Sequence, residues 1–331
     1  MLKIAILDDY AHVAMESADW SRLAGKAEIT VFDRHLGEDE AARELLPFDV
    51  LCTVRERMAL PGALIERLAN LKLITIVGMR LTNLDLDAAT RRGVIVAHSG
   101  ARLAGAANIG AATPELAWGL VIATARHLAA QNRRMRAGLW QNQVGAILAG
   151  RTLGLLGLGR IGQRMARYAT AFDMPVIAWS QNLTAEAAEA VGVRRVEKDE
   201  LFGQADVVSI HLVLSERTRG LVTARELRLM KPTSHLINTS RGPIVVEADL
   251  IAALRAGTIA GAGLDVFDRE PPPADHPFRS MDNVTLTPHL GYATAETLAA
   301  FYSDSLDAIV AFADGAPIRI SNPEALRASE S

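Results

Sequence analysis

The chain has 331 residues, of which 50% are hydrophobic and 22% are charged, and its formal net charge at pH 7 is -3. This length predicts two domains, each large enough to bury a core of its own. The 35 basic residues are scattered among 38 acidic ones, which argues against nucleic acid or an anionic membrane as a partner.

Cys52 is the only cysteine, so no disulfide can form within the chain, and its place in the apolar run 50–54 predicts a buried strand thiol. The apolar start of the chain reaches Asp8 and Asp9 too soon for a signal peptide. No uncharged apolar stretch approaches the roughly 18 residues that span a bilayer. We therefore expect a cytoplasmic protein.

Short apolar runs alternate with segments of helical period over the first hundred residues. Strands are expected at residues 4–7, 29–32, 50–54, 73–77 and 94–97. Amphipathic stretches such as 64–68 and 85–90 lie between them and predict crossover helices. This alternation is typical of a parallel sheet that is covered by helices on both faces.

A second series of the same kind begins at Thr152. Its strands are expected at residues 153–156, 176–179, 207–212, 235–239, 262–266 and 284–286. Its helices include 160–170 and 247–256, the latter closed by Gly257. The fold class predicted is therefore α/β, with two doubly wound parallel-sheet domains.

Two further helices and a tail are expected. An almost unbroken helical pattern runs from Pro114 to about Arg136 and is expected to cross between the domains. Residues 294–313 form another amphipathic pattern. The polar end from Ser321 to Ser331 predicts a loose tail.

The segment Gly157-Leu158-Gly159-Arg160-Ile161-Gly162 follows a predicted strand and opens a predicted helix, as a dinucleotide-binding turn does. Gly157 permits a tight turn, Gly159 lets the backbone approach a pyrophosphate, and Gly162 lets the helix pack against the strand. Free N–H groups at the helix N-terminus then attract the phosphates.

A carboxylate that would bind the adenosine ribose is missing from the end of the next strand, where the chain reads Ser180-Gln181-Asn182. No acid there repels a 2′-phosphate, and no adjacent arginine binds one unless Arg160, Arg194 or Arg195 reaches across. The sequence therefore leaves NAD and NADP equally open as cofactors.

Arg241, Glu270 and His289 each follow a predicted strand, and the last two lie beside prolines that stiffen the backbone. Each residue has an ordinary alternative: a surface ion pair, a solvated loop glutamate and a structural histidine. Most of the eight histidines must be structural or solvated; His127 falls in the long helix, His98 ends a strand, and His12, His35 and His276 have polar surroundings.

Together these segments resemble the D-isomer-specific 2-hydroxyacid dehydrogenases over nearly the whole chain. The resemblance rests on four motifs in the family's order: Leu156 to Gly162, Asn238 to Gly242, Gly263 to Phe267 leading to Glu270-Pro271, and Thr287-Pro288-His289. It implies an NAD(P)-dependent enzyme that interconverts a D-2-hydroxy acid and its 2-oxo acid, similar to glyoxylate/hydroxypyruvate reductase or phosphoglycerate dehydrogenase.

The resemblance also implies site roles. Arg241 would bind the substrate carboxylate and 2-oxo group, and His289 would be the acid/base with Glu270 as its partner. Asp265 would hold the nicotinamide carboxamide, and Thr239 would line the nicotinamide side. His211 matches the start of the strand-end segment over the cofactor, although Val213 replaces the usual proline. Ser180 would lie at the ribose, and no metal site is expected.

The family's architecture implies a Rossmann cofactor domain, residues 99–292, inserted in a flavodoxin-like substrate domain made of residues 1–98 and 293–331. A homodimer is expected, with residues 114–150 as its arm. Arg55, Gly78 and Met79 match substrate-facing loops in position. Arg80 departs from the family's small residue and either contacts a second anionic group or pairs with an acid such as Glu56.

Two alternatives share this fold. A formate or phosphonate-type dehydrogenase would use the same cofactor site on another substrate. A corepressor-like regulatory protein would bind NAD(H) with little turnover. The complete set of Arg241, Glu270 and His289 favours an enzyme.

Overall fold

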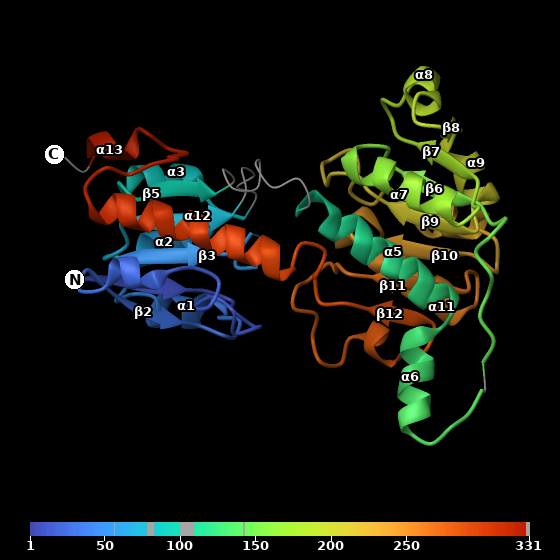
Figure 1. The fold of residues 1–331 in the computed structure, drawn as a ribbon, viewed down its shortest axis with the longest axis horizontal. Helices are drawn as coiled ribbons and strands as arrows, with labels where there is room; N and C mark the ends of the chain where they lie inside the picture. Colours follow the sequence, from blue (N-terminus) through green and yellow to red (C-terminus); the bar gives the residue numbers. More distant parts are fainter. Residues whose placement is uncertain (56, 78–82, 100–108, 142, 329–331) are drawn as a thin grey trace. The chain divides into compact units, whose positions relative to one another are not determined.

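The computed structural model describes residues 1–55, 57–77, 83–99, 109–141 and 143–328. The chain divides into two compact units, which we call unit 1 (Met1–Ile109 with Thr294–Ser331) and unit 2 (Gly110–Ala293). Each unit contains one sheet in which all paired strands are parallel (Figure 1). The predicted fold class, two parallel-sheet α/β domains, is confirmed.

The sheet of unit 1 has the strand order β2-β1-β3-β4-β5. The strands are β1 (Leu2–Ile6), β2 (Ala27–Val31), β3 (Val50–Thr53), β4 (Leu73–Val77) and β5 (Ile95–Ser99). The central strand β3 and its neighbour β4 are buried along their whole length, as expected where helices cover both faces. Cys52 is a buried thiol of β3, as predicted, and burial raises its pKa.

Helices cover both faces of this sheet. Three helices share one core with alternate residues of the strands: α1 (Glu38–Glu44), α2 (Gly62–Arg67) and α3 (Leu86–Arg91). The long helix α12 (Ala295–Ala313) packs on β4 and β5 and is drawn in red in Figure 1. Its side chains Phe301, Tyr302 and Ile309 are almost completely buried, so a segment nearly 200 residues from β5 completes unit 1.

The prediction of a loose tail from Ser321 is wrong for the residues that the structure describes. Asn322 is buried; its Oδ1 accepts the N–H of Val96 at 2.8 Å, and its Nδ2 donates to the carbonyl of Val94 at 2.9 Å. The N–H of Ser321 also donates to the carbonyl of Val96. One asparagine side chain thus bonds two backbone groups at the beginning of the edge strand β5. The short helix α13 (Ala325–Ala328) follows.

The sheet of unit 2 has the order β12-β11-β10-β9-β6-β7-β8. The strands are β6 (Leu153–Leu156), β7 (Val176–Trp179), β8 (Arg194–Arg195), β9 (Val207–Ile210), β10 (His235–Asn238), β11 (Gly261–Leu264) and β12 (Val284–Leu286). From β6 the chain adds β7 and β8 on one side, and it then returns to add β9, β10, β11 and β12 on the other side of β6. The strand order therefore reverses between β6 and β9. In open parallel sheets, ligands bind at the carboxyl ends of the strands beside such a reversal.

Two layers of helices enclose this sheet (Figure 1). One core contains side chains of α5 (Ala112–Ala125) and α7 (Arg160–Ala171). The other contains side chains of α9 (Lys198–Gln204), α10 (Ala224–Leu229) and α11 (Glu247–Arg255). The small helix α8 (Ala185–Glu189) joins the first core through Ala188.

The single helix predicted from Pro114 to Arg136 is two helices, α5 and α6 (Leu128–Arg136), with His127 in the left-handed region at φ 53°. The break is explained by contacts with a later segment of the chain. The carbonyl of Ala125 accepts the N–H of Ala146 at 2.8 Å, and the approach of Gly145 to Arg126 leaves no room for a Cβ. The N–H of Ala146 therefore occupies a carbonyl that would accept a helical hydrogen bond if α5 continued.

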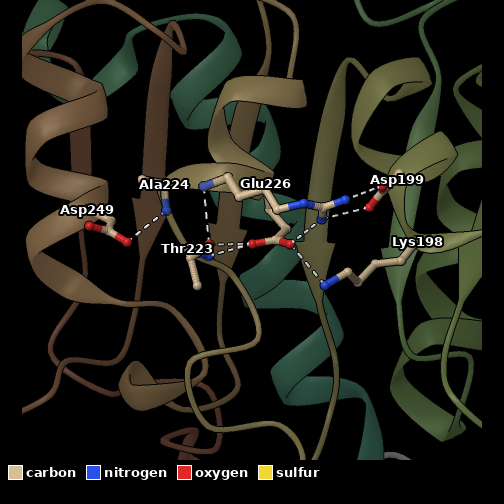
Figure 2. Close-up of polar contacts among 7 residues, drawn as sticks. Lys198, Asp199, Thr223, Ala224, Glu226 and Asp249 are labelled. Atoms are coloured by element: carbon tan, nitrogen blue, oxygen red, sulfur yellow. Dashed lines mark hydrogen bonds and ion pairs between the residues drawn. The ribbon is translucent and has the colours of Figure 1, made fainter.

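A buried carboxylate ties helices of the second layer together (Figure 2). Glu226 closes a capping box with Thr223 at the start of α10, and its Oε1 accepts from Lys198 of α9 at 3.0 Å. Arg225 extends the network to Asp199, and Ala224 N–H donates to Asp249 of α11 at 2.7 Å. Although burial alone would raise the pKa of Glu226, hydrogen bonds from Thr223 and Lys198 lower it to about 2.

Candidate functional site

Four loops of unit 2 leave the carboxyl ends of its parallel strands and therefore meet at one edge of the sheet. The glycine turn follows β6, the Arg241 loop follows β10, the Glu270 loop follows β11, and the His289 loop follows β12. Because β10, β11 and β12 are adjacent, the three predicted catalytic residues come from neighbouring strands. The topology thus brings residues nearly 50 positions apart to the same edge of the sheet.

The three glycines of the turn differ in how much space a side chain would have. Gly157 adopts φ 102°, and a Cβ on it would lie 2.6 Å from the carbonyl oxygen of His211. A Cβ on Gly162 would lie 2.2 Å from the oxygen of Gly157, whereas a Cβ on Gly159 would meet nothing within 4 Å. Gly159 is the N-cap of α7 and has no side-chain cap. Open space therefore lies at the helix end where a pyrophosphate would bind.

The loop that carries Arg241 is held by its own side chains. Asn238 of β10 donates from Nδ2 to the carbonyl of Arg241 at 2.9 Å and accepts the N–H of Ser240 at 3.0 Å. Ser240 donates from its hydroxyl to the carbonyl of Leu212. The Arg241 guanidinium is half-buried and donates to the carbonyl of Ser240 at 2.7 Å.

His289 and Glu270 form a short pair, with 2.5 Å between Nδ1 of the imidazole and Oε2 of the carboxylate. The side chains keep 22% and 32% of their surface exposed, so the pair remains accessible from solvent. The other carboxylate oxygen of Glu270 accepts the N–H of Phe267 at 2.9 Å. This arrangement orients the ring through Nδ1, and Nε2 takes no part in the contact with Glu270.

Asp265 fixes the loop that carries His289. Its carboxylate accepts the N–H groups of Leu290 and Gly291 at 2.7 and 2.9 Å and the hydroxyl of Thr287 at 2.6 Å, and its carbonyl accepts the N–H of His289. These bonds hold His289 at a φ of 54°. Burial raises the pKa of Asp265, whose side chain is completely buried. The predicted contact with a nicotinamide carboxamide stays a prediction.

The Arg241 and Glu270 loops touch through their backbones. A Cβ on Gly242 would lie 2.1 Å from the carbonyl carbon of Phe267 and 2.6 Å from the nitrogen of Asp268. Only a glycine allows this approach. The sequence did not single out Gly242 or this contact.

The other residues predicted to bind the cofactor follow strands of the same sheet as the glycine turn. His211 follows β9, and burial lowers its pKa to about 3, so the ring is neutral; its Nε2 lies 2.9 Å from Ser209 Oγ. Thr239 follows β10, and its buried hydroxyl has no hydrogen-bond partner among the residues that the structure describes. This hydroxyl and the open space at Gly159 fit a bound dinucleotide. Arg160 is exposed and Ile161 half-buried in the first turn of α7, and Ser180 is half-buried after β7.

Two of the three arginines that could have reached a 2′-phosphate are already engaged. Arg194 pairs with Glu200 and Gln204, at 2.9 and 2.7 Å. Arg195 pairs with Glu197 at 2.8 Å and donates to the carbonyl of Leu183. Of the three, Arg160 is best placed because it begins the helix that follows the glycine turn.

The predicted substrate residues belong to unit 1. Arg55 follows β3 at a φ of 51°, is half-buried, and its carbonyl accepts Nδ2 of Asn83 at 3.2 Å. Gly78, Met79 and Arg80, as well as Glu56, lie outside the described residues. Their proposed contacts remain predictions.

The expectation that His276 has polar surroundings is wrong. Its side chain is 8% exposed, its ring packs against Phe267 and Phe278, and its Nε2 lies 3.0 Å from Oε1 of Glu247. Phe278, two residues after His276 in the sequence, was the signal that could have indicated aromatic packing around this histidine. Neither His276 nor Glu247 was predicted to support the site.

Comparison with known families agrees with the fold. Residues 118–291 match the family described as D-isomer specific 2-hydroxyacid dehydrogenase, NAD binding domain. The chain belongs to the D-isomer-specific 2-hydroxyacid dehydrogenases, a family of oxidoreductases, and this region binds a nicotinamide cofactor. No helix among the described residues is long and apolar enough to cross a membrane.

Similar proteins carry several activity names. A glyoxylate reductase of Aeropyrum pernix is 36% identical over 80% of each chain. A D-3-phosphoglycerate dehydrogenase of Archaeoglobus fulgidus is 33% identical over 93% of this chain, which spans only 57% of that protein. A crystal structure of a putative D-3-phosphoglycerate dehydrogenase from Ralstonia solanacearum covers 98% of both chains at 34% identity, with a TM-score of 0.90.

Proposed function

We propose that the protein interconverts a D-2-hydroxy acid and its 2-oxo acid with NAD or NADP. The observation that carries this proposal is the 2.5 Å pair between His289 and Glu270, at the same sheet edge as the glycine turn. The names of the relatives support a small substrate of the glyoxylate, hydroxypyruvate or phosphoglycerate kind.

In the reducing direction, His289 donates a proton from Nε2 to the carbonyl oxygen of the 2-oxo acid. The Glu270 carboxylate stabilises the positively charged imidazole through Nδ1. The Arg241 guanidinium binds the substrate carboxylate and stabilises the negative charge that grows on the oxygen. The hydride for C2 would come from a reduced nicotinamide cofactor, which the glycine turn and Thr239 would hold. In the oxidising direction, neutral His289 removes the hydroxyl proton.

The cofactor would be held by the glycine turn of unit 2. The N–H groups at the start of α7 bind the pyrophosphate, and the space beside Gly159 admits it. Thr239 and His211 would border the nicotinamide half. Ser180 in place of an acid leaves room for either a ribose hydroxyl or a 2′-phosphate. We therefore propose that the enzyme accepts both NADH and NADPH.

Unit 1 would supply substrate recognition, as the substrate domain of residues 1–98 and 293–331. Arg55, Gly78 and Met79 are the proposed substrate contacts. Arg80 either contacts a second anionic group or pairs with a nearby acid. A preference for dicarboxylic over monocarboxylic 2-oxo acids would support the anionic contact.

A homodimer is the assembly we propose, with the region 114–150 as its arm. Six large apolar side chains are exposed here, several of them on the irregular segment after α6: Leu128, Met135, Leu139, Trp140, Val144 and Ile147. Such a concentration marks a protein interface, and a second copy of this chain would cover it. A monomer in sedimentation equilibrium at micromolar concentration would contradict the proposal.

The function is tested by oxidation of NADH and NADPH with a panel of 2-oxo acids: glyoxylate, hydroxypyruvate, pyruvate, phenylpyruvate and branched 2-oxo acids. Turnover of at least one acid supports the proposal. Reduction of NAD or NADP by formate or phosphonate, without turnover of any 2-oxo acid, would support a dehydrogenase of another substrate class. Tight NADH binding without any turnover would support a regulatory protein.

A further inference from the structure

Glu270 is aimed by a hydrogen bond within its own loop. Its Oε2 lies 2.5 Å from His289 Nδ1, and its Oε1 accepts the N–H of Phe267 at 2.9 Å. The direction of the carboxylate therefore depends on where the backbone of Phe267 and Asp268 lies. The loop needs support from outside, because Asp268, Arg269 and Glu270 are exposed.

Glu247 provides this support from the first turn of α11. Its Oε2 accepts the N–H of Asp268 at 3.3 Å, and its Oε1 lies 3.0 Å from Nε2 of His276. One carboxylate thus joins the beginning of the Glu270 loop to His276, which lies beyond Pro271, Pro272 and Pro273. The loop is held at both ends.

His276 is itself fixed in one orientation. Its Nδ1 accepts the N–H of Phe278 at 3.3 Å, so the ring carries its proton on Nε2 and donates it to Glu247. The ring centroid lies 6.4 Å from that of Phe267 and 5.0 Å from that of Phe278. Both ring nitrogens are engaged and the side chain is buried. His276 therefore orients the loop and takes no part in proton transfer to substrate.

We propose that Glu247 and His276 are a positioning pair for Glu270 and act on the reaction only through the Glu270–His289 pair. The proposal rests on the dehydrogenase function proposed above. It assigns the two histidine–glutamate pairs different tasks. The pair of His289 and Glu270 moves a proton, whereas His276, which is buried, and Glu247 hold the loop that carries Glu270 in place.

Hydrogen exchange of the cofactor-free protein is the first test, because it does not depend on activity. In His276→Ala and Glu247→Ala, the amides of residues 267–270 should exchange about 10-fold faster than in the wild type. His276→Gln, whose side-chain amide can still reach Glu247, should restore most of the protection. His235→Gln is the matched control, since His235 is buried at the opposite end of β10. Unchanged exchange at 267–270 in His276→Ala would overturn the proposal.

A double-mutant cycle in the full-length enzyme tests the route through Glu270. His276→Ala should lower kcat about 10-fold in the wild-type background and hardly further in the Glu270→Gln background. The affinity for NADH should stay the same. Equal losses in both backgrounds would show that His276 does not act through Glu270. A wild-type enzyme without turnover on any 2-oxo acid would refute the proposed function, whereas the exchange result would still decide whether the pair holds the loop.

Discussion

Gly242 lies so close to Phe267 that a Cβ on the glycine would be 2.1 Å from the carbonyl carbon of the phenylalanine. This contact joins the loop after β10, which carries Arg241, to the loop after β11, which carries Glu270. The relative position of the guanidinium and the carboxylate is therefore set by a backbone contact that no side chain can replace.

Replacing Gly242 with alanine should separate these two loops. We expect Gly242→Ala to cost about 1 to 3 kcal/mol of stability through overpacking and to lower kcat/KM by at least about 10-fold, because Arg241 and Glu270 move apart. Thermal unfolding and steady-state kinetics measure the two effects. Gly203→Ala in α9 is the control, since its Cβ would meet only Leu229 O at 3.9 Å. Wild-type kinetics in Gly242→Ala would contradict this account.

Glu226 should make stability depend on pH. Its pKa in the folded protein is about 2, against an ordinary value of 4.5. The carboxylate therefore stabilises the fold above pH 4.5 by roughly 3 kcal/mol, and this contribution is lost as the pH falls toward 2. Glu226→Gln should lower the Tm most at pH 7, and its difference from the wild type should shrink below pH 4.5.

The control for this experiment is Glu189→Gln, which removes an exposed carboxylate from α8. It should leave the pH dependence of the Tm unchanged. A constant difference between Glu226→Gln and the wild type from pH 7 to pH 3 would show that the Figure 2 network does not hold a charged Glu226.

Ser180 should govern the choice of cofactor. A carboxylate at this strand end binds the ribose hydroxyls and repels a 2′-phosphate. We expect Ser180→Asp to lower kcat/KM for NADPH by at least about 10-fold relative to NADH, because the two negative charges repel. Ser180→Asn, which has a similar size without the charge, should change the ratio little. An unchanged NADPH/NADH ratio in Ser180→Asp would place the adenosine ribose elsewhere.

Arg241 should bind the substrate rather than the cofactor. One lysine ammonium cannot reproduce the two parallel hydrogen bonds of a guanidinium to a carboxylate. Arg241→Lys should therefore raise KM for the 2-oxo acid about 10- to 100-fold and leave the Kd for NADH unchanged. Arg255→Lys, on the exposed last turn of α11, is the control. An unchanged KM would remove Arg241 from the carboxylate role.

Much of the fold followed from local patterns in the sequence. Buried parallel strands such as residues 153–156 are continuous apolar runs, and Gly157 and Gly162 mark the turn between strand and helix. The helix break at His127 could not be predicted in this way, because it depends on Ala146, which is distant in sequence, taking the carbonyl of Ala125. The order at Asn322 likewise depends on tertiary contacts with β5.

The candidate site was predictable to a similar extent. Arg241, Glu270 and His289 follow strands that can be recognised, so their common edge follows from parallel pairing. The support of these residues was not predictable. The contact of Gly242 with Phe267 and the pairing of Glu247 with His276 join segments about 25 to 30 residues apart, and no local periodicity encodes them.

The most direct test of the account is the turnover of His289→Ala, with NADH affinity measured on the same preparation by fluorescence. His12→Ala is the control, because His12 is exposed in unit 1. If His289 is the acid/base, kcat for the best 2-oxo acid should fall by about 10² to 10⁴ while NADH still binds. Near wild-type turnover in His289→Ala would contradict the account.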